Sequence, residues 1–185
     1  MMKTVVSTIT STMTSTVTWT SLVLAALAGP AAAHAVLSPP EAPADSYFKA
    51  TIGIAHGCEG TPTLRVRVRI PDGINSVKPM PKAGWELAIK RDELAQPVTG
   101  PHGERITQRV SEVTWSGKLL DDNFDEFIMQ VRLPDKPGET LYFATVQECE
   151  KGVHRWIEIP AAGQSRGQLR EPAPVLKLLP KRGGH

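Results

Sequence analysis

Apolar and polar residues alternate with a period of two along much of the chain after residue 33. The clearest run is Thr63 to Ile70, where aliphatic residues alternate with Arg65, Arg67 and Arg69. Successive side chains of a strand leave opposite faces, so this run predicts a half-buried antiparallel strand with its arginines toward solvent. A nucleic-acid-binding stripe is the alternative for these arginines. No aromatic residues are interleaved with them, however, so we expect no nucleic-acid partner.

Further runs with a less regular alternation predict additional strands, and turn-forming residues such as Pro71-Asp72-Gly73 separate them. These runs are Tyr47 to Ala55, Trp85 to Ile89, Ile106 to Trp115, Glu126 to Leu133, Thr140 to Gln147 and Val153 to Ile159. No convincing long helix interrupts them. The pattern therefore predicts an all-β fold, an immunoglobulin-like or cupredoxin-like β-sandwich of about seven to nine strands over residues 34–160.

The carboxyl-terminal segment, residues 161–185, has a different character. It is rich in Gly, Gln and Pro and lacks a sustained period. This composition predicts a loosely packed, extended tail. Within it, Val175 to Leu179 is apolar enough to dock as a last edge strand.

Residues 1–33 have the pattern of an export signal. They contain one charged residue, Lys3, then a Ser/Thr-rich stretch, the apolar run Leu22 to Ala28, and the small residues Ala31-Ala-Ala33. We expect cleavage before His34 and a periplasmic or secreted mature protein. An uncleaved anchor is the alternative, but the apolar run falls short of the roughly 20 residues that a spanning helix needs. We therefore expect no membrane span in the mature chain.

Charge and motif content exclude several classes of function. The formal net charge is +2 and the isoelectric point is near 8.6, so neither a polyanion-binding surface nor an acidic solvating chain is indicated. The sequence has no Gly-rich phosphate loop, no Gly-x-Ser-x-Gly elbow and no His-Glu-x-x-His pair. These absences remove the commonest nucleotide-enzyme and hydrolase interpretations.

Two cysteines, Cys58 and Cys149, are far apart in the sequence and lack the spacing of a zinc or redox motif. In an oxidising compartment outside the cytoplasm, such a pair predicts one structural disulfide. A pair of soft copper ligands is the alternative. The turn-like surroundings of both residues favour a structural disulfide that joins two loops.

The expected amino terminus carries the candidate chemistry. A first-position histidine, His34, offers a primary amine and an imidazole to one metal ion, which suits the tetragonal geometry that Cu(II) prefers. The amine exists only after cleavage and must be deprotonated to bind. Because an α-amino pKa is near 7.7 to 8.0, binding is expected to weaken as the pH falls. The alternative is that His34 is merely the residue after the cut.

Several short motifs, each weak alone, follow one another along the chain. They are His34 with Ser38-Pro39-Pro40, Ile70 to Gly73, Val77 to Pro79, Pro81 to Trp85, Val113 to Gly117, Phe124 to Phe127, and Gln147 to Gly152 leading to Trp156. Their order resembles that of the YcnI-like domain family of exported copper-binding proteins, over residues 34–159. The resemblance implies a β-sandwich that holds Cu(II) through a single-histidine brace, with a carboxylate and a neighbouring tryptophan, in a metallochaperone role.

Carried over to this sequence, the resemblance assigns His34 as the brace, Glu126 as the carboxylate and Trp156 as the neighbouring indole. A carboxylate supplies a hard oxygen and cancels one positive charge, while an indole can exclude water from the ion. The alternatives are that Glu126 is a solvated strand-end residue and that Trp156 packs in the core.

The sequence departs from the family pattern around Cys58 and Cys149. If a disulfide joins these loops, His56, Glu148 and His154 become candidates for extra ligands near the metal. An isolated histidine is otherwise more often a surface residue.

The sequence leaves three function classes open. We favour a non-enzymatic Cu(II) carrier that exchanges copper with a membrane copper transporter or another periplasmic carrier. A histidine-brace copper oxidoreductase is the alternative, but it needs a second equatorial histidine and a flat aromatic surface, for which the chain has few residues. A metal-free extracellular interaction domain is the third possibility.

Overall fold

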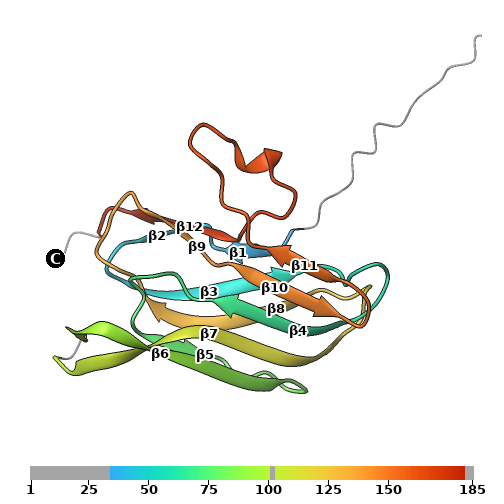
Figure 1. The fold of residues 1–185 in the computed structure, drawn as a ribbon, viewed down its shortest axis with the longest axis horizontal. Helices are drawn as coiled ribbons and strands as arrows, with labels where there is room; N and C mark the ends of the chain where they lie inside the picture. The colour runs from blue at the N-terminus through green and yellow to red at the C-terminus, as the bar shows by residue number, and fades with distance from the viewer. Residues whose placement is uncertain (1–33, 101–102, 182–185) are drawn as a thin grey trace, which may run out of the picture. The chain divides into compact units, whose positions relative to one another are not determined.

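The computed structural model describes residues 34–100 and 103–181 and shows an all-β domain (Figure 1). The predicted signal peptide, residues 1–33, lies outside the described residues. The strands are β1 (Val36–Ser38), β2 (Glu41–Pro43), β3 (Tyr47–Ile54), β4 (Thr63–Arg69), β5 (Val77–Pro79), β6 (Glu86–Thr99), β7 (Arg105–Leu119), β8 (Asp125–Arg132), β9 (Thr140–Tyr142), β10 (Thr145–Cys149), β11 (Val153–Trp156) and β12 (Val175–Leu179). A single 3-10 turn, η1 (Arg166–Gln168), is the only helical element among the described residues.

The strands form three sheets. The first has the order β1-β3-β8-β5, the second β11-β10-β4-β7-β6, and the third β2-β12-β9. All neighbouring strands are antiparallel except β2 and β12, which are parallel. The edge strands β1 and β11 therefore belong to different sheets, and each carries one border of the candidate site (Figure 1).

The core lies between the inward faces of these sheets. In β4, Val66 and Val68 are fully buried while Arg65, Arg67 and Arg69 alternate with them on the outer face, as the pattern predicts. The rings of Trp115 from β7 and Phe127 from β8 have centroids 5.5 Å apart, which joins the second sheet to the first. A sandwich whose two sheets share aromatic contacts confirms the predicted fold class.

The β6–β7 hairpin is much longer than its pattern predicts. We expected strands ending at Ile89 and beginning at Ile106, whereas β6 runs to Thr99 and β7 from Arg105 to Leu119. The outer part of this hairpin buries neither face, so its side chains show no alternation in hydrophobicity. Backbone hydrogen bonds and a side-chain hydrogen bond from Gln108 Nε2 to Glu93 Oε1 at 2.6 Å link the two strands of this ribbon, and a hydrophobic pattern cannot report such bonds.

The carboxyl-terminal segment is packed at its end, whereas residues 161–170 are mostly exposed, as the sequence predicted. Leu176 and Leu178 of β12 are buried, and β12 lies between β2 and β9 instead of at an edge. The domain thus continues past residue 160, where the sequence predicted its end. The strand is short and its partners are distant in sequence, so its burial depends on contacts that local composition does not reveal.

Short strands account for the remaining differences. The predicted strand over residues 140–147 is divided into β9 and β10, and the one over residues 153–159 ends at Trp156. The three-residue strands β1, β2 and β5 were not predicted, because three residues are too few to establish a period.

Candidate functional site

The candidate site lies where the first and second sheets present neighbouring edges. His34 stands two residues before β1, and its imidazole contacts the indole of Trp156 at the end of β11, with ring centroids 5.6 Å apart and planes at 67°. The indole is buried, with 4% of its surface exposed. The structure therefore brings the predicted brace histidine and the predicted neighbouring tryptophan together from positions 122 residues apart in the sequence (156 − 34).

Two more histidines join this contact. His154 stacks on Trp156 with centroids 4.8 Å apart and planes at 26°, and His56 meets His154 edge-on at 5.6 Å. His154 and Trp156 share a face of β11 because they are two residues apart on a strand. We call His34, His56, His154 and Trp156 the histidine–tryptophan cluster.

A buried amide, Gln147 of β10, holds the cluster in place. Its Nε2 donates to the carbonyl oxygen of His56 at 2.6 Å and to Thr63 Oγ1 at 2.8 Å, while its Oε1 accepts from Trp156 Nε1 at 3.1 Å. Only 1% of Gln147 is exposed. A buried amide is costly unless its hydrogen bonds are made, so this set of bonds fixes the His56 backbone relative to the indole.

The predicted disulfide is confirmed. Cys58 and Cys149 are bonded, with their Cα atoms 5.8 Å apart. The bond ties the loop that follows β3, which contains His56, to the last residue of β10. The covalent link therefore brings His56 toward the β10–β11 hairpin that carries His154.

Glu171, from the loop before β12, orients His154 and was missed by the sequence analysis. Its Oε1 lies 2.8 Å from His154 Nδ1, and its Oε2 accepts the backbone N–H of Arg155 at 2.9 Å. Partial burial by itself raises the pKa of Glu171, but these two hydrogen bonds outweigh it and the net pKa lies below the ordinary value. No spacing or motif in the sequence connects Glu171 to His154.

The predicted carboxylates Glu126 and Glu148 lie in different sheets, on β8 and β10 respectively. Glu126 is exposed on β8, opposite Gly53 of β3, which in turn pairs with Val36 of β1. The ring of Phe124 occupies the space beside Gly53, where a Cβ atom would approach it to 3.2 Å. Glu126 thus lies in the same sheet as the start of β1 but two strands away.

Glu148 faces away from the histidine–tryptophan cluster. It alternates with the buried Gln147 along β10 and forms ion pairs with Arg65 and Arg67 on the outer face of the second sheet. The predicted solvent-facing arginines therefore neutralise a carboxylate that the sequence offered as an extra ligand.

Within residues 34–100 and 103–181, no group of three His, Cys, Asp or Glu side chains is close enough to hold a metal ion. The cluster thus supplies imidazole ligands, but its side chains do not form a three-ligand metal site. If the chain is cleaved between residues 33 and 34, the new primary amine of His34 would add a further nitrogen ligand. Residue 33 lies outside the described residues. Imidazole and amine nitrogens are ligands that suit copper and zinc.

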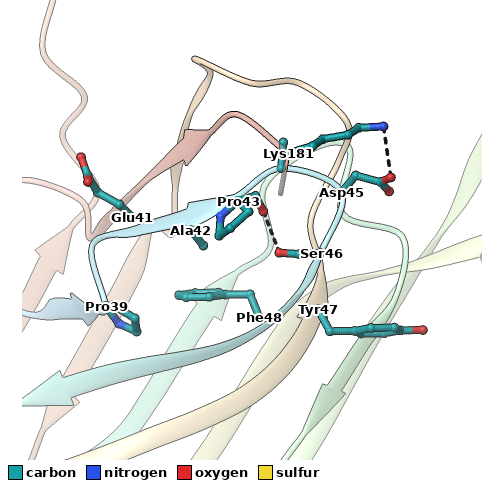
Figure 2. Close-up of a pocket in the computed structure, with 10 residues that line it drawn as sticks. Pro39, Glu41, Ala42, Pro43, Asp45, Ser46, Tyr47, Phe48 and Lys181 are labelled. Atoms are coloured by element: carbon teal, nitrogen blue, oxygen red, sulfur yellow. Dashed lines mark hydrogen bonds and ion pairs between the residues drawn. The ribbon is translucent and has the colours of Figure 1, made fainter. Parts of the chain in front are cut away.

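A separate pocket lies at the β2–β3 turn, next to Lys181 (Figure 2). Ser46 Oγ donates to the Pro43 carbonyl at 2.6 Å, and Tyr47 and Phe48 form part of the wall. None of the predicted ligands lines this pocket. Its two carboxylates are paired with cations, Asp45 with Lys181 inside the pocket and Glu41 with Lys177 outside it.

Ion pairs brace this turn. Asp45 pairs with Arg132 at 2.5 Å and with Lys181 at 3.2 Å (Figure 2 shows the second pair). Hydrogen bonds from Arg132 and Lys181 hold the pKa of Asp45 below its ordinary 3.8. Hydrogen bonds to Asp135 and Asp45 raise the pKa of Lys181 above its ordinary 10.5.

Asp45→Asn is expected to lower the melting temperature slightly at neutral pH, since exposed ion pairs contribute little. A depressed carboxyl pKa stabilises the fold above the unfolded-state pKa, and this contribution disappears as the pH falls through the folded-state pKa. The difference from the parent should therefore be constant between about pH 5 and 7 and close below about pH 3. Thermal unfolding at several pH values measures it, with Asp122→Asn as a surface control. A gap that persists in acid would contradict the ion-pair explanation.

A comparison with known protein families shows which family the chain belongs to. Residues 34–178 match the family described as "Domain of unknown function (DUF1775)". The chain belongs to this family. The match begins at His34 and ends within β12, so the DUF1775 domain includes the strand that the sequence analysis assigned to the tail.

A solved structure supports the fold of this DUF1775 domain. It is titled "Crystal structure of an uncharacterized protein from Nocardia farcinica reveals an immunoglobulin-like fold". The likeness has a TM-score of 0.61 at 23% identity, and it covers 79% of this chain and 98% of the other. At this identity the likeness establishes the immunoglobulin-like fold alone. Comparison with curated proteins found no match.

Among the described residues, no helix has the length and apolar character needed to cross a membrane.

Proposed function

We propose that this DUF1775 protein is an exported Cu(II) carrier, a periplasmic metallochaperone that binds its cargo through the amino-terminal His34. The observation that carries the proposal is the contact between His34 and the buried indole of Trp156. The residue expected to become the amino terminus is also the first residue of the family match. Its imidazole already lies beside the tryptophan that the YcnI-like resemblance assigns to the metal.

The chain's own groups define how cargo would be held and released. The amine and imidazole of His34 form one chelate ring, and Trp156 shields one side from water. Glu126 is the proposed carboxylate, and it must reach across β3 from an exposed position on β8. Protonation of the amine competes with the metal, so the carrier should release copper more readily as the pH falls.

Acetylating the α-amino group of His34 tests the chelate directly. Acetylation keeps every side chain but removes the amine lone pair that closes the ring, so Cu(II) affinity should fall at least about tenfold, or about 1.4 kcal/mol. Competition titration measures the affinity, and electron spin resonance reports the change in nitrogen ligation. The matched control is the mature chain with a free amino group, taken through the same treatment. Unchanged affinity and an unchanged spectrum would overturn the proposal.

Two substitutions in the same assay test the remaining assignments. Glu126→Gln removes the charge at constant size and should weaken Cu(II) binding by a further factor of about ten if the carboxylate is a ligand. Trp156→Phe keeps an aromatic wall, so affinity should change little, while quenching of tryptophan fluorescence by copper should shrink. Parent-like affinity for Glu126→Gln would remove Glu126 from the ligand set and leave the His34 chelate standing.

A further inference from the structure

We propose that the outer face of the first sheet is the contact surface of a symmetric dimer of this chain. This face is formed by β1, β3, β8 and β5, in that order (Figure 1). In β8, its outward residues alternate with the buried Phe127, Met129 and Val131. None of the four residues of the histidine–tryptophan cluster belongs to these strands. A dimer through this face is therefore independent of the proposed copper site.

The two ends of this face carry opposite charges. At the end where β1 starts, Glu126 of β8 lies opposite Gly53 of β3. Further along β8, Gln130 pairs with Lys49 of β3 on one side and with Lys78 of β5 on the other. Glu126, Lys49 and Lys78 are exposed, and within the part of the chain that the structure describes they form no ion pair. Their charges are thus available to a second molecule.

Apolar side chains lie between and beyond these charges. Between them, Ile128 of β8 is half-buried, and Met80, whose backbone N–H donates to the Ile128 carbonyl oxygen at 2.9 Å, is 48% exposed. Beyond them, Phe124 just before β8 is 60% exposed and Tyr47 at the start of β3 is 50% exposed. Exposed apolar groups that gather on one face with charges around them are typical of an interaction surface.

A two-fold axis makes this face complementary to itself. When the axis lies between two copies and runs across the strands at Ile128, it reverses the strand direction in the second copy and stacks each strand on its equivalent. Glu126 then lies over Gln130 of the second copy, because both are two residues from Ile128 on β8. Lys49 and Lys78 flank that glutamine on the neighbouring strands, about 4.8 Å to either side. Each carboxylate therefore meets two lysines, and the contact occurs twice.

The same axis brings the aromatic residues of the two ends together. Phe124 comes to lie over the region of Tyr47 and Arg132 in the second copy, and Arg132 already lies 5.2 Å from the centroid of the Tyr47 ring. Aromatic and cation–π contacts thus accompany the ion pairs. An axis that runs along the strands would instead place Glu126 next to its own copy. Since like charges across an interface are unfavourable, the charges select the first arrangement.

The size of the face sets the expected strength of the dimer. Its four strands cover about 27 Å by 19 Å, which amounts to about 500 Å² per copy and about 1,000 Å² for the pair. An area of about 1,000 Å² is the lower end for a specific interface. We therefore expect a reversible dimer with a dissociation constant in the micromolar range.

The test is sedimentation equilibrium of the mature chain in the presence of a metal chelator, so that copper plays no part. The parent should show a monomer–dimer equilibrium across the micromolar range. Glu126→Lys should weaken dimerisation at least about tenfold, because it brings only positive charges together. The double variant Lys49→Glu, Lys78→Glu should weaken it similarly, because it brings only negative charges together. Lys90→Glu, at an exposed position on β6 of the second sheet, is the matched control and should leave the equilibrium unchanged.

Mixing the two variants tests the symmetry of the contact. In a dimer of the Glu126→Lys chain with the Lys49→Glu, Lys78→Glu chain, opposite charges face each other at both contacts. The mixture should therefore dimerise about as tightly as the parent, although neither variant does so alone. Circular dichroism checks that each variant is folded. If one is not, the salt dependence of the parent decides, since salt screens exposed ion pairs and should weaken the dimer.

Several results would overturn the dimer. They are a parent that stays monomeric across the micromolar range, a dimer that neither charge variant weakens, a mixture of folded variants that stays monomeric, and a parent dimer that salt does not weaken. None of these results bears on the His34 chelate, because no metal is present in the measurement.

Discussion

Replacing Cys58 and Cys149 together by alanine is expected to lower the free energy of unfolding by about 4 to 5 kcal/mol in the chain-entropy account of disulfide stabilisation. The bond joins residues 91 positions apart, so its loss frees a long loop in the unfolded chain. This is a large fraction of the 5 to 15 kcal/mol that domains typically have. Urea unfolding followed by tryptophan fluorescence measures the change.

The same substitution should also affect the site. Without the covalent bond, the loop that carries His56 is held through hydrogen bonds, including those from Gln147 Nε2 to the His56 carbonyl oxygen and from the Gly57 backbone N–H to Asp121 Oδ1. The ring resonances of His56 should therefore shift or broaden more than those of His154, which Glu171 holds. Lys151→Ala, in the adjoining turn, is the control. A loss of stability below about 1 kcal/mol, or two free thiols in the oxidised parent, would contradict the structural role of the bond.

Phe127→Ala is expected to cost about 3 to 5 kcal/mol of stability, which is the usual range for removing a large buried aromatic ring. The side chain is fully buried, and its ring contacts Trp85 at 4.9 Å and Trp115 at 5.5 Å. The substitution leaves a cavity between the first and second sheets that these rigid neighbours cannot fill. Thermal and urea unfolding measure the effect.

Phe124→Ala provides the matched control, because it removes the same ring three residues earlier in the chain. Phe124 is 60% exposed, so its loss should cost less than about 1 kcal/mol. Equal effects at the two positions would mean that the contact between the sheets does not dominate the core.

The carrier and oxidoreductase hypotheses differ in whether His154 binds the same ion as His34. A two-histidine brace needs a second imidazole on the ion that His34 binds. The structure offers His154 on the same tryptophan, but the described residues hold no three-ligand group that includes both. A spin-resonance spectrum of the copper-loaded mature protein that loses a nitrogen in His154→Phe would favour the oxidoreductase, and an unchanged spectrum would favour the carrier.

Sequence periodicity predicted the strands in which one face is buried. Thr63 to Ile70 became β4 with its arginines outward, and the run from Tyr47 became β3. Alternation reports burial directly, so it succeeds where a strand has one buried face. It failed over the outer half of β6, where neither face is buried. At β12 the apolar run indicated a docking strand over Val175 to Leu179 but not its central place between β2 and β9.

The candidate site was predictable only in part. The small residues before position 34 and the order of the family motifs indicated His34 and Trp156. The expected export and the spacing of the two cysteines predicted the disulfide that the structure contains. The link between Glu171 and His154, and the orientation of Glu148 toward Arg65, were not predictable. Both depend on which strands become neighbours.

By itself, therefore, the sequence determined a β-sandwich, one disulfide and a histidine at the expected amino terminus. These features follow from local alternation, residue type and order along the chain. Only the tertiary structure decided that His34, His56 and His154 gather around Trp156 and that Gln147 and Glu171 orient them. Such contacts arise from long-range strand pairing between β10, β11 and the loops that pack on them, and no local pattern encodes that pairing.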